Sequence, residues 1–137
     1  MFIVIIGCGR TGSRLAGHLS SAGHDLVVVD QNEETFQDLP VEFSGFEITG
    51  NALVHNTLEE ARLETADLCI ISTDKDKVNF MISQLIQNKY PGTKIIVKGI
   101  EPKLIDIYDH DKVTVFSEKD ILVDKIYNSI VSNEVSG

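Results

Sequence analysis

Short apolar runs alternate with amphipathic segments along the chain. Apolar residues recur at helical spacing in several of the intervening segments, most clearly from Val78 to Ile86, where Pro91-Gly92 then ends the pattern. The runs themselves are short and mostly rich in β-branched residues, which is typical of buried parallel strands. They lie at Phe2–Ile6, Leu26–Asp30, Phe46–Thr49, Leu68–Ile71, Lys94–Val97 and Val113–Phe116.

This alternation predicts an α/β protein. Strands joined by helices favour right-handed crossovers and a mostly parallel sheet. We therefore expect a three-layer Rossmann fold with six strands in the order 3-2-1-4-5-6 and helices on both faces. Besides the helix through Val78, the expected helices follow Gly12, run from Glu33 to about Leu39, and span Leu53–Leu63, Pro102–Tyr108 and Glu118–Val131. One domain, residues 1–131, accounts for these elements, and the polar tail 132–137 is expected to fray.

Glycines directly follow the first apolar run. Gly7 permits a tight turn, Gly9 lets the backbone approach a pyrophosphate, and Gly12 lets the next helix lie close to the strand. Asp30 ends the second strand at about the distance along the chain where a carboxylate binds ribose hydroxyls. Strand, glycines, helix, strand and acid in this order indicate a dinucleotide or adenine nucleotide site, against the alternative of a merely glycine-rich turn.

Composition excludes several function classes. The chain has 137 residues and a net charge of -9, with no basic run, which argues against nucleic-acid binding. No apolar stretch approaches the roughly 18 residues of a membrane span, so we expect a cytoplasmic protein without direct membrane insertion. Cys8 and Cys69 form no metal-binding or CxxC spacing, and are expected to be reduced residues of the interior.

Geometry places the site at the carboxyl ends of the strands. The candidate segments there are Gly7–Gly12, Asp30, Gly50–Ala52, Ser72–Asp74, Lys98 and Glu118. None of the four histidines is obviously aimed at a nicotinamide, and Asp109-His110-Asp111 has the pattern of a polar turn. We therefore assign no catalytic residue and no metal ligand. The nucleotide-binding unit uses the whole chain, which favours a binding protein over the alternative of a small NAD-dependent oxidoreductase or a fragment of one.

The combination of motifs resembles the TrkA-N domain, also called RCK-N or KTN. The likeness covers nearly the whole chain and rests on Gly7 to Gly12, Ala22-Gly23-His24-Asp25, Val29 to Asn32, Thr49 to Ala52, Glu60-Ala61 before Ala66-Asp67, Thr73-Asp74 before Asn79, and Ser117-Glu118. The resemblance implies a cytoplasmic regulatory domain of a membrane potassium channel or transporter subunit. It also implies binding of NAD(H) or of ATP, ADP or AMP without turnover, and assembly as a homodimer or larger ring.

The resemblance also implies roles for single residues. The glycine turn with Arg10 and Thr11 would hold phosphates, Asp30 the ribose, Asn51 with Ala52 the adenine edge, and Thr73, Lys98 and Glu118 the second half of the ligand. Glu118 would either cap its helix or help to hold Mg²⁺ or Ca²⁺ with ATP. The expected cofactor-binding set is Gly7, Gly9, Arg10, Thr11, Gly12, Asp30, Gln31, Asn51, Ala52, Thr73, Asp74, Lys98 and Glu118.

The chain departs from the family pattern in three places. Gly50-Asn51-Ala52 stands where Gly-Asp-Ala is common and matches the ATP- and ADP-binding branch, while Tyr108 to Asp111 replaces Leu-Gly-Ala-Asp. The second regulatory domain that usually follows is not in this sequence. The last helix carries apolar residues around more of its circumference than one buried stripe requires, which favours self-association over burial within its own domain.

Overall fold

The computed structural model describes residues 1–132, and its centre is a single parallel sheet of six strands. The strand order β3-β2-β1-β4-β5-β6 confirms the predicted topology. The predicted tail 132–137 lies, except for Ser132, outside the described residues. The strands are β1 (Phe2–Ile6), β2 (Asp25–Asp30), β3 (Phe46–Thr49), β4 (Leu68–Ile71), β5 (Lys94–Gly99) and β6 (Val113–Ser117).

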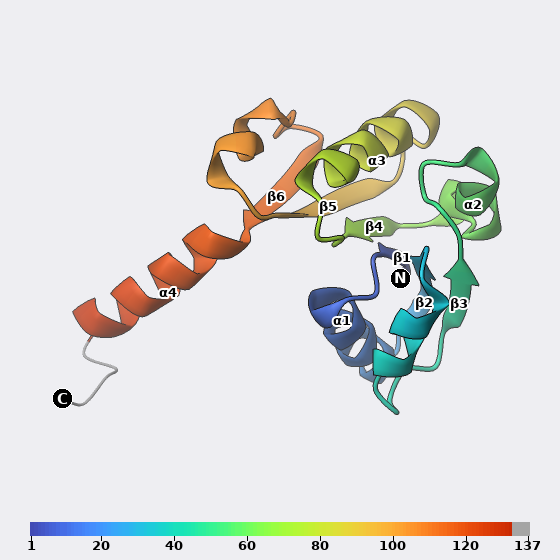
Figure 1. Ribbon diagram of the computed structural model, residues 1–137, viewed down its shortest axis with the longest axis horizontal. Helices are drawn as coiled ribbons and strands as arrows, with labels where there is room; N and C mark the ends of the chain where they lie inside the picture. The colour runs from blue at the N-terminus through green and yellow to red at the C-terminus, as the bar shows by residue number, and fades with distance from the viewer. Residues whose placement is uncertain (133–137) are drawn as a thin grey trace.

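Helices lie on both faces of this sheet, as predicted, and Figure 1 shows α1 and α3 on opposite sides of the strands. Successive strand residues point to opposite faces, so Val4 and Ile6 enter a core with α2 and α3, while Ile3 and Ile5 enter a second core with α1. The long helices are α1 (Arg10–Ser21), α3 (Asp76–Lys89) and α4 (Glu118–Val131), and α2 (His55–Glu60) is short.

Three predicted helices differ in kind or extent. Residues 33–38 and 102–107 form the 3-10 helices η1 (Glu33–Asp38) and η3 (Pro102–Ile107). Asn32 caps η1, because its side chain accepts a hydrogen bond from the Glu34 N–H. The predicted helix 53–63 is interrupted, because Arg62 has a positive φ of 62°, and η2 (Leu63–Thr65) follows it. A left-handed residue cannot continue a right-handed helix.

The last helix, α4, is not covered by the rest of the described chain. Figure 1 shows it projecting away from the sheet, and none of its residues is buried. Its apolar side chains are between 50% exposed at Ile121 and 65% exposed at Tyr127. Burial of this helix within its own domain, the alternative considered from the sequence, is therefore wrong for the described chain. Within residues 1–132, no helix is long and apolar enough to cross a membrane.

Candidate nucleotide-binding site

The glycine turn joins β1 to α1 and has the geometry expected from the sequence. Gly7 has a φ of 100°, a conformation that L side chains rarely adopt, and its N–H donates to the Val29 carbonyl at 2.8 Å. A Cβ on Gly12 would lie 1.9 Å from the Gly7 carbonyl oxygen, so only glycine allows α1 to come this close to the turn. These two glycines therefore shape the turn, and Gly12 touches no cavity of the site.

Gly9 faces open space at the start of α1. A Cβ built there would meet no atom within 4 Å, and Gly9 also lines a candidate cavity. No side chain caps α1, and its first turn contains no acidic residue. The free N–H groups and the positive end of the helix dipole thus remain available to an anion such as a phosphate.

Asp30 connects the end of β2 to the glycine turn. Its Oδ2 accepts a hydrogen bond from the Cys8 N–H at 2.8 Å, and its Oδ1 accepts one from the Asn32 N–H at 2.9 Å. Each carboxylate oxygen has a second lone pair, so both can still accept a ribose hydroxyl. Asp30 therefore has a structural role, which the sequence did not reveal, beside its place in the cavity wall.

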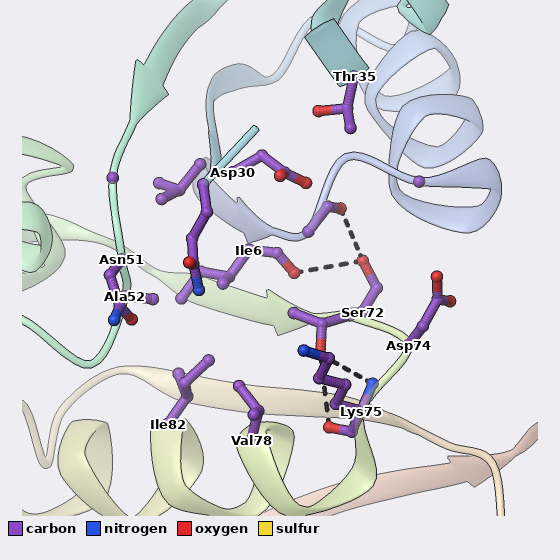
Figure 2. A pocket seen from close by; sticks show the side chains of 16 residues that line it. Ile6, Asp30, Thr35, Asn51, Ala52, Ser72, Asp74, Lys75, Val78 and Ile82 are labelled. Carbon is purple, nitrogen blue, oxygen red and sulfur yellow. Dashed lines mark hydrogen bonds between the residues drawn. The ribbon is translucent and has the colours of Figure 1, made fainter. Parts of the chain in front are cut away.

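A cavity of about 360 Å³ lies between the glycine turn, the end of β2 and the start of α3. Figure 2 shows Asp30 and Thr35 on one side of it and Val78 and Ile82 of α3 on the other. The cavity brings together eight residues of the predicted set: Gly7, Gly9, Asp30, Gln31, Asn51, Ala52, Thr73 and Asp74.

The loop after β3 forms the far end of this cavity. Asn51 folds back on its own chain, since its Oδ1 accepts a hydrogen bond from the Leu53 N–H at 2.9 Å. The amide NH₂ of Asn51 donates to no partner within the described residues, so it can donate toward a ligand. Gly50 N–H donates to the Asp30 carbonyl at 2.9 Å, which keeps this loop beside the end of β2.

Three other predicted residues lie in a second cavity of about 260 Å³ on the α1 face of the sheet. Thr11, Lys98 and Glu118 line it together with apolar residues of β5, β6 and α4. The Nζ of Lys98 donates to Asp74 Oδ1 at 3.2 Å, which ties the two cavity walls together. Ser72 lines both cavities and donates from its Oγ to the Gly7 carbonyl at 3.0 Å.

Arg10 lies in neither cavity. It is the first residue of α1 and is exposed, and within the described chain its guanidinium has no ion-pair or hydrogen-bond partner. The phosphate contact by Arg10 stays a prediction.

The sequence analysis missed part of the cavity wall. Thr35, Lys75, Val78 and Ile82 line the cavity but were not in the predicted set. Val78 and Ile82 are one turn apart on the amphipathic helix, so its apolar spacing carried the signal. Thr35 and Lys75 had no such signal, because their position depends on how η1 and α3 meet the ends of the strands.

The cysteines are interior thiols, and the described residues contain no candidate metal centre. Burial, and then the neighbouring Asp30 carboxylate, raise the pKa of the Cys8 thiol from 9.0 to about 11. Burial raises the pKa of Cys69 further. In residues 1–132, no three His, Cys, Asp or Glu side chains are grouped so that they could hold an ion. The arrangement offers hydrogen bonds, a helix N-terminus and one apolar wall to a nucleotide.

Comparison with known proteins identifies relatives of this arrangement. The family profile of the TrkA-N domain matches residues 3–117. The Trk system potassium uptake protein TrkA homolog of Pyrococcus horikoshii is 30% identical over 138 residues, which cover 96% of this chain and 60% of the relative. The chain thus spans less than two thirds of that relative's length.

Two solved structures share the fold. One is the Kef CTD of Shewanella denitrificans in AMP-bound form, with a TM-score of 0.79 and 23% identity, covering 99% of this chain and 84% of the other. The other is the GsuK channel bound to NAD, with a TM-score of 0.81 and 22% identity, covering 97% of this chain and 24% of the channel. At these identities the likeness establishes the fold alone.

Proposed function

The chain belongs to the TrkA-N domain family, and from that membership we propose that it is a cytoplasmic regulatory domain that binds an adenine nucleotide and controls potassium ion transport. The observation that carries the proposal is the cavity wall formed by Gly9, Asp30 and Ala52 beside the uncapped start of α1. A phosphate would lie at the helix N-terminus and the ribose hydroxyls at Asp30.

The proposed ligands are NAD(H) or ATP, ADP and AMP. Related folds carry both kinds of nucleotide, since the Kef domain contains AMP and the GsuK channel contains NAD. The first cavity suits the adenosine half, and the second, with Thr11, Lys98 and Glu118, suits the other half of a dinucleotide. With ATP, the exposed Arg10 would meet the terminal phosphates, and Glu118 would help to hold Mg²⁺ or Ca²⁺.

We propose binding without turnover, in place of an NAD-dependent oxidoreductase. The carboxylates that line the first cavity are both engaged, Asp30 with two backbone N–H groups and Asp74 with Lys98. Their engagement suits holding a ligand better than transferring a proton. Oxidation or reduction of NAD(H) by the purified chain with any acceptor or reductant would contradict this part of the proposal.

The proposed partners are a potassium channel or transporter subunit and a second copy of this chain. The support for self-association is α4, whose exposed apolar residues form a surface with no cover in the described chain. Phe116, half exposed at the base of α4, extends this surface toward the second cavity. A second α4 offers the same apolar residues in return, as a two-fold interface requires.

A thermal-shift screen with NAD, NADH, ATP, ADP and AMP tests the nucleotide proposal. A ligand present at 100 times its dissociation constant stabilises the folded state by about 2.7 kcal/mol. For a domain of this size, that corresponds to a rise in Tm of roughly 8 to 14 °C. Cytidine nucleotides serve as the control, since they carry the phosphates without the adenine. No shift with any of the five nucleotides, together with no heat of binding by calorimetry, would refute the proposal.

A further inference from the structure

A buried asparagine connects the two cavities at the edge of the sheet. The pairing of β4 with β5 ends at Ile71 and Val97, so the next residues of each strand have no ladder partner there. Asn79, in the first turns of α3, lies against this break and is 0% exposed. Its side chain takes over the connection that the strands no longer make.

The hydrogen bonds of Asn79 reach both segments. Its Nδ2 donates to the carbonyl of Thr73 at 3.1 Å and to the carbonyl of Lys98 at 3.2 Å. Its Oδ1 accepts a short hydrogen bond from the Thr73 hydroxyl. One amide group thus fixes the position of Thr73 relative to Lys98.

These two residues face different cavities. Thr73 lines the first cavity, and Lys98 lines the second. Ile95 and Val97 of β5 enter the core with α3, so the side chain of Lys98 shares the opposite face with Ile96. Asn79 therefore binds the backbone of Lys98 on one face of the sheet, while the side chain of Lys98 lines the second cavity on the other face.

We propose that Asn79 is a positioning residue that sets the spacing between the two cavities, so that one dinucleotide can contact both. This inference rests on the proposed function. On this proposal, the buried amide of Asn79 favours ligands that span both cavities, such as NAD, over ligands confined to the first cavity, such as AMP. A change at Thr73 would act on both ligands, whereas a shift of Lys98 away from Thr73 would weaken only the larger ligand, on its second side.

Neighbouring contacts fasten the same two segments. Asp76 accepts hydrogen bonds from the N–H groups of Ile100 and Glu101, both at 2.9 Å. These contacts hold the chain after β5 but touch neither Thr73 nor Lys98. These contacts should keep α3 in place when Asn79 is replaced, so variants at Asn79 are expected to fold.

Calorimetric titration of NAD and AMP into Asn79→Leu tests the proposal, because leucine keeps the volume of the side chain but makes no hydrogen bond. We expect NAD binding to weaken about tenfold more than AMP binding, the scale of one hydrogen bond to a charged group made only on the Lys98 side. Asn79→Ser, a smaller polar replacement, should show the same change in ratio and serves if Asn79→Leu does not fold. Circular dichroism checks the fold of each variant.

Ser83→Ala is the matched control. Ser83 is also 0% exposed on α3, and its hydroxyl bonds only the Phe80 carbonyl of its own helix, at 2.7 Å. A similar change in the NAD-to-AMP ratio in this control would overturn the inference, as would an unchanged ratio in both Asn79 variants. Wild-type chain that binds AMP but not NAD overturns it too, since no dinucleotide then spans the cavities. Binding of ATP or ADP without NAD overturns the inference in the same way, whereas a wild-type chain that binds none of the five adenine nucleotides refutes the proposed function itself.

Discussion

Asp30 combines a proposed ligand contact with an observed structural one. Its carboxylate already receives the N–H groups of Cys8 and Asn32, and this fixes the glycine turn before any ligand arrives. A preformed turn lowers the ordering cost of binding. The same carboxylate would repel a ribose 2′-phosphate, so the proposed site favours NAD over NADP.

Asp30→Ala should therefore weaken binding and stability together. Loss of charge-assisted hydrogen bonds to ribose should cost about 1.5 to 3 kcal/mol of binding free energy, which is roughly 10- to 100-fold in affinity. The free energy of unfolding should also fall, because two backbone N–H groups lose their acceptor. Calorimetry with AMP and urea unfolding measure the two effects. Unchanged affinity for every adenine nucleotide would show that Asp30 serves only the turn.

The Cys8 thiol makes stability depend on alkaline pH. Burial raises its pKa from 9.0 to about 11, so between these values the unfolded chain loses a proton that the folded chain retains. The Cys8 contribution to the free energy of unfolding should be constant below pH 9 and should decline as the pH rises toward 11. Tyr108 contributes a later decline in the same direction, since burial, and then the charge of Asp76, raise its pKa from 10.0 to about 12.

Urea unfolding of Cys8→Ser from pH 8 to 11 isolates this contribution. Serine keeps the size of the side chain but does not titrate in this range, so the decline should be shallower than in the wild type. Cys69→Ser is a useful comparison, because burial raises the pKa of that thiol as well. A wild type and a Cys8→Ser variant with the same pH slope would refute the assignment.

Gly9 and Gly12, at the start of α1, have different roles in the glycine turn. A Cβ at Gly12 would collide with the Gly7 carbonyl at 1.9 Å, whereas a Cβ at Gly9 would meet nothing within 4 Å. Gly9 also has a φ of -84°, which alanine tolerates. Gly12 is thus a requirement of the fold, whereas we propose that Gly9 is a requirement of ligand binding.

The paired variants should separate these requirements. Gly12→Ala should lower the free energy of unfolding by about 1 to 3 kcal/mol or more, as overpacking does. Gly9→Ala should cost about 1 kcal/mol or less as a weaker helix cap, yet weaken nucleotide binding more than tenfold, because the methyl group occupies the approach of the phosphate. Gly92→Ala, also in open space, is the control for both measurements. Tight nucleotide binding by Gly9→Ala would contradict the proposed phosphate position.

The strands were readable from the sequence because their apolar runs are short and mostly rich in β-branched residues, and Gly7 and Gly50 directly end two of them. Helix type was less readable. Arg62 ends the helical path by adopting a positive φ, although nothing in its side chain marks it as the residue that would. Asn79 and Lys75 were missed at the site for a related reason, since their roles depend on contacts between segments that lie far apart in the sequence.

At the scale of the whole molecule, the described chain leaves the apolar surface of α4 uncovered. The sheet and its two layers bury most of their apolar residues, but α4 projects from the body and none of its residues is buried. Glu118, the first residue of α4, also lines the second cavity. Any partner that fixes α4 therefore fixes one wall of the proposed ligand site, which is how ligand binding would reach a transporter subunit.

Self-association through α4 follows from this surface. Sedimentation at high micromolar concentration should show a dimer for the wild type, and Ile126→Asp should shift it toward monomer by at least tenfold in the dissociation constant. Burial of one such side chain is worth about 1.5 to 3 kcal/mol, and a two-fold interface contains two. Met81→Asp on α3 is the matched control, because Met81 is 51% exposed and Ile126 is 54% exposed. A strict monomer in the wild type, or equal effects of the two substitutions, would show that α4 is not the contact surface between copies of this chain.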